Sequence, residues 1–185
     1  MIASASSLST EQLQEQIWSW LHLVPDPEIP VISVVDLGIV RDVQVSTSTG
    51  TSADDEQEVQ CTIVITPTYS GCPAMQVISQ EIVAVLAQHG VAGVAIQTRL
   101  SPAWSTDWMS EHGKSQLKGY GIAPPAQQVI DISGISRKRL QAPKVACPHC
   151  GSMHTVVVSQ FGSTSCKSLY QCKDCLEPFD YFKAH

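Results

Sequence analysis

The stretches Cys147-Pro-His-Cys150 and Cys172-Lys-Asp-Cys175 decide the fold of the C-terminal part of this chain. Each is a Cys-x-x-Cys pair, and 21 residues separate the two pairs. A Cys-x-x-Cys turn points its two sulfurs the same way, so a hairpin that joins two such turns offers four thiolates to one tetrahedral ion. This spacing predicts a zinc site with Cys147, Cys150, Cys172 and Cys175 as ligands, inside a small β zinc ribbon over residues 141–185. Because protein sulfurs would fill all four positions, we expect the zinc to be structural.

Two disulfides, or a thioredoxin-like redox motif, are the alternatives for these cysteines. The redox motif belongs near the start of a βαβ unit, and no such pattern surrounds either pair. The chain has seven cysteines, an odd number, and four of them have metal-ligand spacing, which favours a reducing compartment. Cys166 lies six residues before Cys172 and is either an extra ligand or a small buried side chain. Gly151, directly after the first pair, suits a turn with positive φ.

Composition limits the location and the partners of the chain. Its 185 residues carry a net charge of −6, which argues against a protein held mainly by nucleic-acid phosphates. No run of about 18 apolar residues predicts a membrane span, and residues 1–10 are too polar for a secretory signal. We therefore expect a cytoplasmic protein with a mobile N-terminus over residues 1–10 and no membrane partner.

Residues 11–103 are expected to form an α+β domain that begins with a helix. Ser9-Thr-Glu-Gln12 is a capping-box pattern, and apolar residues follow it at helical spacing. Strands are expected at residues 39–45 and 58–66, and a polar, acidic loop over residues 46–57 joins them.

The second of these strands has apolar residues at alternate positions, which places Cys61 in the core. Pro73 then opens a second helix that ends at Gly90, and residues 93–100 supply a third strand. The order of elements predicts a small mixed sheet with helices, followed by the zinc ribbon.

Cys72 is the residue of this domain that is best placed for chemistry, because it directly precedes the helix that Pro73 opens. Free N–H groups and the helix dipole favour the thiolate, which attacks electrophiles or binds soft metals. We therefore predict a moderately lowered pKa for Cys72; the alternative is a small residue at a helix start with no chemistry. A cysteine-dependent enzyme would need a base nearby, and His89 lies about 25 Å away along the same helix.

The stretch of residues 104–140 is expected to be a helical and linker segment between the domain and the ribbon. Trp104, Trp108 and Met109 at its start are apolar. They form either a docking surface for a partner or a cover for the core.

Three motifs resemble those of the MIP18 family, also called the domain of unknown function 59 family, whose members commonly assist iron–sulfur cluster assembly. They are Asp26-Pro-Glu-Ile-Pro, Asp36-Leu-Gly-Ile-Val and Thr66-Pro-Thr-Tyr-Ser-Gly-Cys-Pro. Further stretches are similar to the family of phenylacetyl-CoA epoxidase D subunits: Pro102-Ala-Trp-Ser-Thr-Asp-Trp-Met, Tyr120-Gly-Ile-Ala-Pro-Pro, Phe161-Gly-Ser-Thr-Ser-Cys-Lys and Glu177-Pro-Phe-Asp-Tyr-Phe-Lys. This resemblance runs from about Leu13 to the C-terminus.

The resemblance implies an accessory protein of aerobic phenylacetate degradation, in which a di-iron monooxygenase epoxidises phenylacetyl-CoA and a reductase carries flavin and an iron–sulfur cluster. Its implied partners are these oxygenase and reductase subunits and iron–sulfur assembly proteins. Its implied task is to assist iron–sulfur or di-iron centre assembly, with Cys72 as the functional thiol and Asp36 and Thr66 as partner residues. Transient iron, or a transient cluster, is the implied cargo.

The chain itself lacks the Glu-x-x-His pairs of a di-iron bundle and the Gly-x-Gly-x-x-Gly loop of a dinucleotide site, so we expect no enzyme activity of its own. A structural or regulatory subunit of the epoxidase without a maturation role is the first alternative. A cysteine-dependent enzyme is the second. The sequence also leaves a homo-oligomer open.

Overall fold

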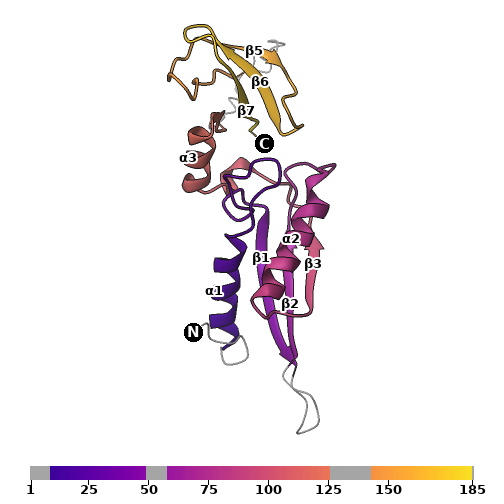
Figure 1. Ribbon diagram of the computed structural model, residues 1–185. Helices are drawn as coiled ribbons and strands as arrows, with labels where there is room; N and C mark the ends of the chain where they lie inside the picture. Colours follow the sequence, from indigo (N-terminus) through magenta and orange to yellow (C-terminus); the bar gives the residue numbers. More distant parts are fainter. Residues whose placement is uncertain (1–8, 49–57, 126–142, 185) are drawn as a thin grey trace, which may run out of the picture. The chain divides into compact units, whose positions relative to one another are not determined.

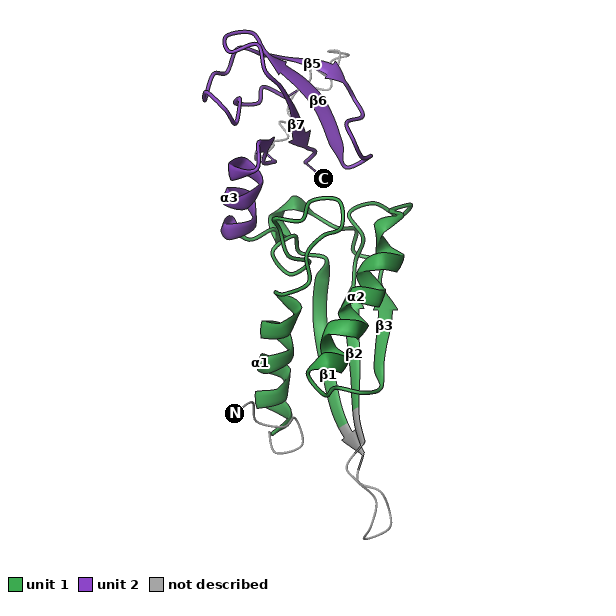
Figure 2. Cartoon of the chain, viewed as in Figure 1, with its two compact units in different colours: residues 1–110 green, residues 111–185 purple. Residues whose placement is uncertain are grey.

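The computed structural model describes residues 9–48, 58–125 and 143–184 (Figure 1). The chain divides into two compact units, which are unit 1 at residues 1–110 and unit 2 at residues 111–185 (Figure 2). The mobile N-terminus and the acidic loop that the sequence predicts fall almost entirely outside the described residues. Among the residues described, no helix combines the length and the apolar character needed to cross a bilayer.

Unit 1 begins with helix α1, Thr10–Leu21. The predicted capping box is present, because the Ser9 side chain accepts from the backbone N–H of Gln12 and the Gln12 side chain accepts from the N–H of Ser9. Leu13, Ile17 and Leu21 form the buried stripe of this helix. The sequence pattern therefore sets both the start and the inward face of α1.

The sheet of unit 1 has the order β1-β2-β3, with β1 at Val40–Ser48, β2 at Glu58–Ile65 and β3 at Val94–Thr98. β1 and β2 are antiparallel. Helix α2, Ala74–Gln88, connects β2 to β3, and these two strands are parallel. The small mixed sheet is as predicted, and Cys61 in β2 is fully buried.

The apolar segment at the end of unit 1 covers the core. It contains the short 3-10 helix η2, Thr106–Trp108. Trp104 and Met109 are each 4% exposed, and the indole Nε1 of Trp104 donates to the carbonyl of Leu37 at 3.1 Å. Of the two interpretations of this segment, the structure supports the core cover for Trp104 and Met109.

Unit 2 begins with helix α3, Glu111–Gly119. Its four-stranded sheet has the order β4-β7-β6-β5. The strands are β4 at Ile122–Ala123, β5 at Thr155–Ser159, β6 at Lys167–Cys172 and β7 at Pro178–Phe182. β4 comes from the stretch that the sequence suggested was a linker, yet it pairs in parallel with β7 and its two side chains are buried. The sheet of the ribbon therefore includes a strand that precedes the four cysteines in the sequence.

Candidate functional site

The four cysteines of the two Cys-x-x-Cys pairs converge in unit 2. The Sγ atoms of Cys147, Cys150, Cys172 and Cys175 all lie within 4.8 Å of one another. Two of the separations are 3.7 Å, between Cys147 and Cys175, and 3.6 Å, between Cys150 and Cys172. Zn–S bonds of about 2.3 Å in a tetrahedron place the sulfurs about 3.8 Å apart. The thiols are therefore already at the spacing that a metal ion with four sulfur ligands requires.

Backbone hydrogen bonds hold each cysteine turn. The N–H of Gly151 donates to the carbonyl of Cys147 at 2.9 Å, and Gly151 has the predicted positive φ, 78°. In the second turn the N–H of Cys172 donates to the carbonyl of Glu177 at 3.0 Å. The backbone N–H groups of Cys175 and Asp174, together with the neighbouring thiols, lower the pKa of Cys172 to about 6, against the effect of burial. Cys172 is thus biased towards the thiolate form that binds metal.

Asp174 joins the two turns through side chains for which the sequence predicted no role. Its carboxylate accepts from the Ser152 hydroxyl, and its Oδ1 lies 3.1 Å from Nδ1 of His154. These two contacts lower the pKa of Asp174. The x positions of a Cys-x-x-Cys pair carry no sequence signal for such a role, because the partners become neighbours only when the hairpin closes.

Cys166 lies outside the group of four thiols. It is 5% exposed, and its Sγ lies 3.0 Å from Oγ1 of Thr164. Its carbonyl accepts from the N–H of Lys183 at 2.9 Å. Cys166 is thus a buried side chain next to the start of β6. Its role as an extra ligand stays a prediction.

Cys72 in unit 1 is half-buried and lies at the start of α2, as predicted. Its N–H donates to the carbonyl of Tyr69 at 3.1 Å, which closes the turn before the helix. The backbone N–H groups of Ala74 and Met75 act to lower the pKa of this thiol, as a helix start should. The thiol is therefore held at the helix start.

The predicted net shift of the Cys72 pKa is nevertheless wrong in direction. Burial is the largest influence, and it raises the pKa of the thiol; the negative charges of Glu28 and Asp26 raise it further. Together these outweigh the helix start, so the net shift of the Cys72 pKa is upward. The turn sequence alone contains only the opposing, pKa-lowering influence.

Asp26 and Glu28 lie in the loop after α1, which several hydrogen bonds hold in place. Oδ1 of Asp26 accepts from the backbone N–H groups of Glu28 and Ile29, at 2.9 and 2.8 Å, and Asp26 is 6% exposed. The N–H of Asp26 donates to the carbonyl of Ile32 at 2.9 Å. These bonds fix the loop whose carboxylates influence Cys72. The available signal was the motif Asp26-Pro-Glu-Ile-Pro, whose acidic residues had no predicted role of their own.

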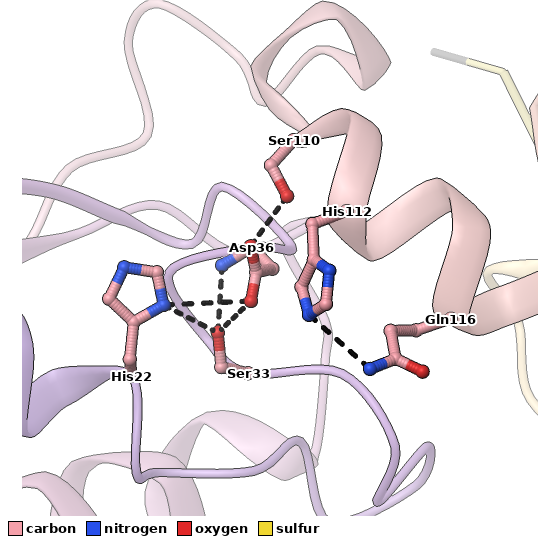
Figure 3. A network of polar contacts seen from close by, with 6 residues as sticks. All are labelled: His22, Ser33, Asp36, Ser110, His112 and Gln116. Carbon is pink, nitrogen blue, oxygen red and sulfur yellow. Dashed lines mark hydrogen bonds and ion pairs between the residues drawn. The ribbon is translucent and has the colours of Figure 1, made fainter.

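Asp36 is the centre of a polar network in unit 1 (Figure 3). Its carboxylate accepts from the hydroxyls of Ser33, at 2.7 Å, and Ser110, at 2.5 Å. Nδ1 of His22 lies 3.5 Å from Oδ2 of Asp36. The network ties the loop after α1 to the end of unit 1. The role of Asp36 towards Cys72 stays a prediction.

Figure 3 also draws the contact between the side chains of His112 and Gln116, one turn apart on α3 in unit 2, whose ring and amide nitrogens lie 3.3 Å apart.

Thr66, the other predicted partner of Cys72, is 2% exposed, and its N–H donates to the carbonyl of Ile39 at 2.8 Å. Thr66 therefore extends the pairing just beyond β2. Its role in the site also stays a prediction.

Comparison with known families divides the chain in the same way. Residues 14–96 match the model described as an iron–sulfur cluster assembly protein. This domain contains Cys72 and the loop after α1 that carries Asp26 and Glu28. Residues 133–183 match the model described as the PaaD zinc β-ribbon domain, which contains the four thiols.

Individual relatives match either nearly the whole chain or a little over half of it. The D subunit of the "Putative 1,2-phenylacetyl-CoA epoxidase" of Escherichia coli is 43% identical over 178 residues, which cover 96% of each chain. The "Fe-S protein maturation auxiliary factor" of Porphyromonas gingivalis is 36% identical over 57% of this chain and 91% of its own. A crystal structure of a domain of unknown function DUF59 from Bacillus anthracis is 28% identical, covers 58% of this chain and 93% of its own, and has a TM-score of 0.49.

Proposed function

Because the chain belongs to the family of phenylacetyl-CoA epoxidase D subunits, in which an iron–sulfur cluster assembly domain precedes a PaaD zinc β-ribbon, we propose that it assists the assembly of a metal centre in another protein. The client is the iron–sulfur reductase or the di-iron oxygenase of a phenylacetyl-CoA epoxidase. The chain performs no oxygenation itself. It acts as an accessory factor.

The observation that carries this proposal is the setting of Cys72. A single half-buried thiol lies at the start of α2, receives backbone N–H groups and is influenced by two carboxylates from the loop after α1. This arrangement lies in the unit that matches the iron–sulfur cluster assembly model. Relatives of that unit carry the name of maturation auxiliary factors.

The electrostatics of Cys72 suit a transient ligand. A thiolate binds iron, but the charges of Glu28 and Asp26 help to keep the proton on sulfur while no cation is present. An approaching iron ion or cluster offsets these charges, and the proton can then leave. The same carboxylates would oppose a free thiolate nucleophile, which favours metal cargo over a cysteine-dependent enzyme. We propose that the client supplies the remaining ligands.

The four thiols of unit 2 have a different task in this proposal. They would hold one Zn2+ with protein ligands only, so the ion would stabilise the ribbon and keep no open position for chemistry. The iron or cluster passes through unit 1 and not through this site.

The test compares reductase and oxygenase subunits produced with and without this protein. We expect the reductase or the oxygenase made without it to contain less iron, and in the reductase case less acid-labile sulfide, at unchanged protein yield. Equal metal content in both preparations would contradict the proposal. A loss of epoxidase activity at unchanged metal content, with this chain present in full stoichiometry in the complex, would support the structural or regulatory subunit instead.

A further inference from the structure

Charge is distributed very unevenly along this chain. Residues 1–110, which make up unit 1, contain twelve acidic and two basic side chains, a net charge of −10 with histidine neutral. Residues 111–185 contain five acidic and nine basic side chains, a net charge of +4. Unit 1 therefore has a strongly negative field, although the whole chain carries only −6.

The acidic residues of unit 1 avoid one continuous part of its sequence. Glu81 is the single Asp, Glu, Lys or Arg between Val59 and Thr98. This stretch contains most of β2, all of α2 and all of β3. The helix and β3 lie side by side in Figure 1 and contact each other. Unit 1 therefore combines an acidic body with an almost uncharged side.

The outward face of α2 is unusual for a helix in contact with water. Its exposed residues are Gln76, Val77, Gln80, Glu81, Val83, Ala84, Ala87 and Gln88. Half of these are valine or alanine, with Val77 at 43% and Val83 at 38% exposure, and one is charged. The exposed face of α1, by contrast, contains no apolar residue. A solvated helix face normally carries charged and polar residues, so this face has the composition of a contact surface.

The strand β3 extends this surface. It is the edge strand next to β2, and its sequence Val94-Ala-Ile-Gln-Thr98 contains no charge and no proline. Charged residues and prolines are the usual protection of a sheet edge against pairing with another chain. We call the exposed residues of α2 together with β3 the neutral side. It begins next to Cys72, because the exposed residues Ser70, Gly71 and Pro73 around the thiol are uncharged as well.

We propose that the neutral side is the docking surface for the client protein, and that the client's matching surface is apolar at its centre and basic at its rim. The proposal rests on the proposed function and names the partner surface of the same site. A client bound along α2 has its own ligands brought towards Cys72 at the start of that helix. Basic residues at its rim meet the negative field of unit 1, which speeds association and orients the encounter.

A second copy of this chain is the competing occupant of the neutral side. Two copies that met through it would bring two bodies of charge −10 together. Like charges disfavour that contact, whereas a basic rim favours a client. The charge of unit 1 therefore disfavours a symmetric dimer through the neutral side and favours a client with a basic rim.

The test measures binding of the full-length protein to iron-free reductase and oxygenase subunits. Ala84→Glu or Val77→Glu puts a negative charge at the centre of the contact, and we expect about tenfold weaker binding or more. Ala84→Gln adds bulk without charge and should retain most of the affinity. Val158→Glu is the matched control, because Val158 is 57% exposed on β5 of unit 2. For the wild type, we expect weaker binding in about 0.3 M salt than in about 0.05 M salt.

Several results would overturn the docking proposal. These are unchanged binding of the Ala84→Glu and Val77→Glu variants, loss of binding in Val158→Glu, no binding of wild type to either iron-free subunit, and a wild-type dimer that Ala84→Glu dissociates. The metal content of the clients separates this proposal from the proposed function. If an Ala84→Glu variant loads the client fully while absence of the protein does not, the function stands and the docking surface is wrong.

Discussion

At the scale of single residues, opposing influences act on the pKa of Cys72, and the sequence motif does not show which of them is larger. The helix start acts as predicted, but burial and two carboxylates from a distant loop reverse its effect on the thiol pKa. The convergence of the four thiols was predictable because each pair is local and a site of this kind needs four sulfurs. The direction of the shift in the Cys72 pKa was not predictable, because Glu28 and Asp26 influence the thiol only after the chain folds.

The variant Glu28→Gln tests this electrostatic account of Cys72. Removing one negative charge should lower the thiol pKa, so the thiolate fraction and the rate of alkylation near pH 8 should rise, and the pH–rate curve should move to lower pH. Mass spectrometry can follow each thiol separately. Cys61 serves as the internal reference, since burial raises its pKa to about 11.

Glu81→Gln is the matched control, because it removes an exposed carboxylate from α2. Its pH–rate curve for Cys72 should coincide with that of the wild type. Identical curves for Glu28→Gln and the wild type would show that the Glu28 charge does not act on the thiol.

At the scale of elements, the turn before β1 depends on one glycine. Gly38 has a φ of 75°, and a Cβ there would lie 2.6 Å from the carbonyl oxygen of Trp108. Gly90, at the end of α2, also has a positive φ, 82°, but an added Cβ would meet nothing within 4 Å. The two glycines therefore separate backbone strain from a steric clash.

We expect Gly90→Ala to lower the free energy of unfolding by about 1 kcal/mol, the usual cost of a left-handed conformation for a residue with a Cβ. Gly38→Ala should cost clearly more, because the Trp108 backbone must also move. Urea unfolding followed by tryptophan fluorescence measures both, since all four tryptophans lie in unit 1. Equal losses for the two variants would contradict the packing of the Trp108 segment on this turn.

The periodicity of the sequence predicted the long elements and missed the two-residue strand β4. The capping box and apolar spacing of α1, and the alternation around Cys61, were sufficient because these patterns repeat over several turns or residues. β4 has two residues, too few for any period, and its strand conformation follows from pairing with β7. The place of Trp104 was open for a similar reason, since its partner Leu37 is distant in the sequence.

At the scale of the whole molecule, we expect the two units to respond differently to metal removal, because only unit 2 contains the group of four thiols. Unit 2 surrounds its four thiols with a small core, and structural zinc contributes on the order of 10–16 kcal/mol in comparable peptides. A chelator, or Cys172→Ala, should therefore unfold the ribbon. Unit 1 has its own core of helices and sheet, and it should stay folded.

Circular dichroism and tryptophan fluorescence distinguish the two units in that experiment. We expect a loss of ribbon signal and of about one zinc per chain by elemental analysis, with the tryptophan spectrum unchanged. A ribbon that remains folded without metal, or iron in place of zinc, would refute the structural role of the site.

The most direct measurement of the central claim is the iron and sulfide content of the epoxidase reductase and oxygenase produced together with wild-type protein, Cys72→Ser or Cys61→Ser. Cys72→Ser changes little in volume, so it should keep unit 1 folded and the ribbon metal bound. We expect the client made with Cys72→Ser to have the low metal content of a client made in the absence of this protein, and the client made with folded Cys61→Ser to be loaded. Full metal content with the Cys72→Ser variant would show that Cys72 takes no part in loading.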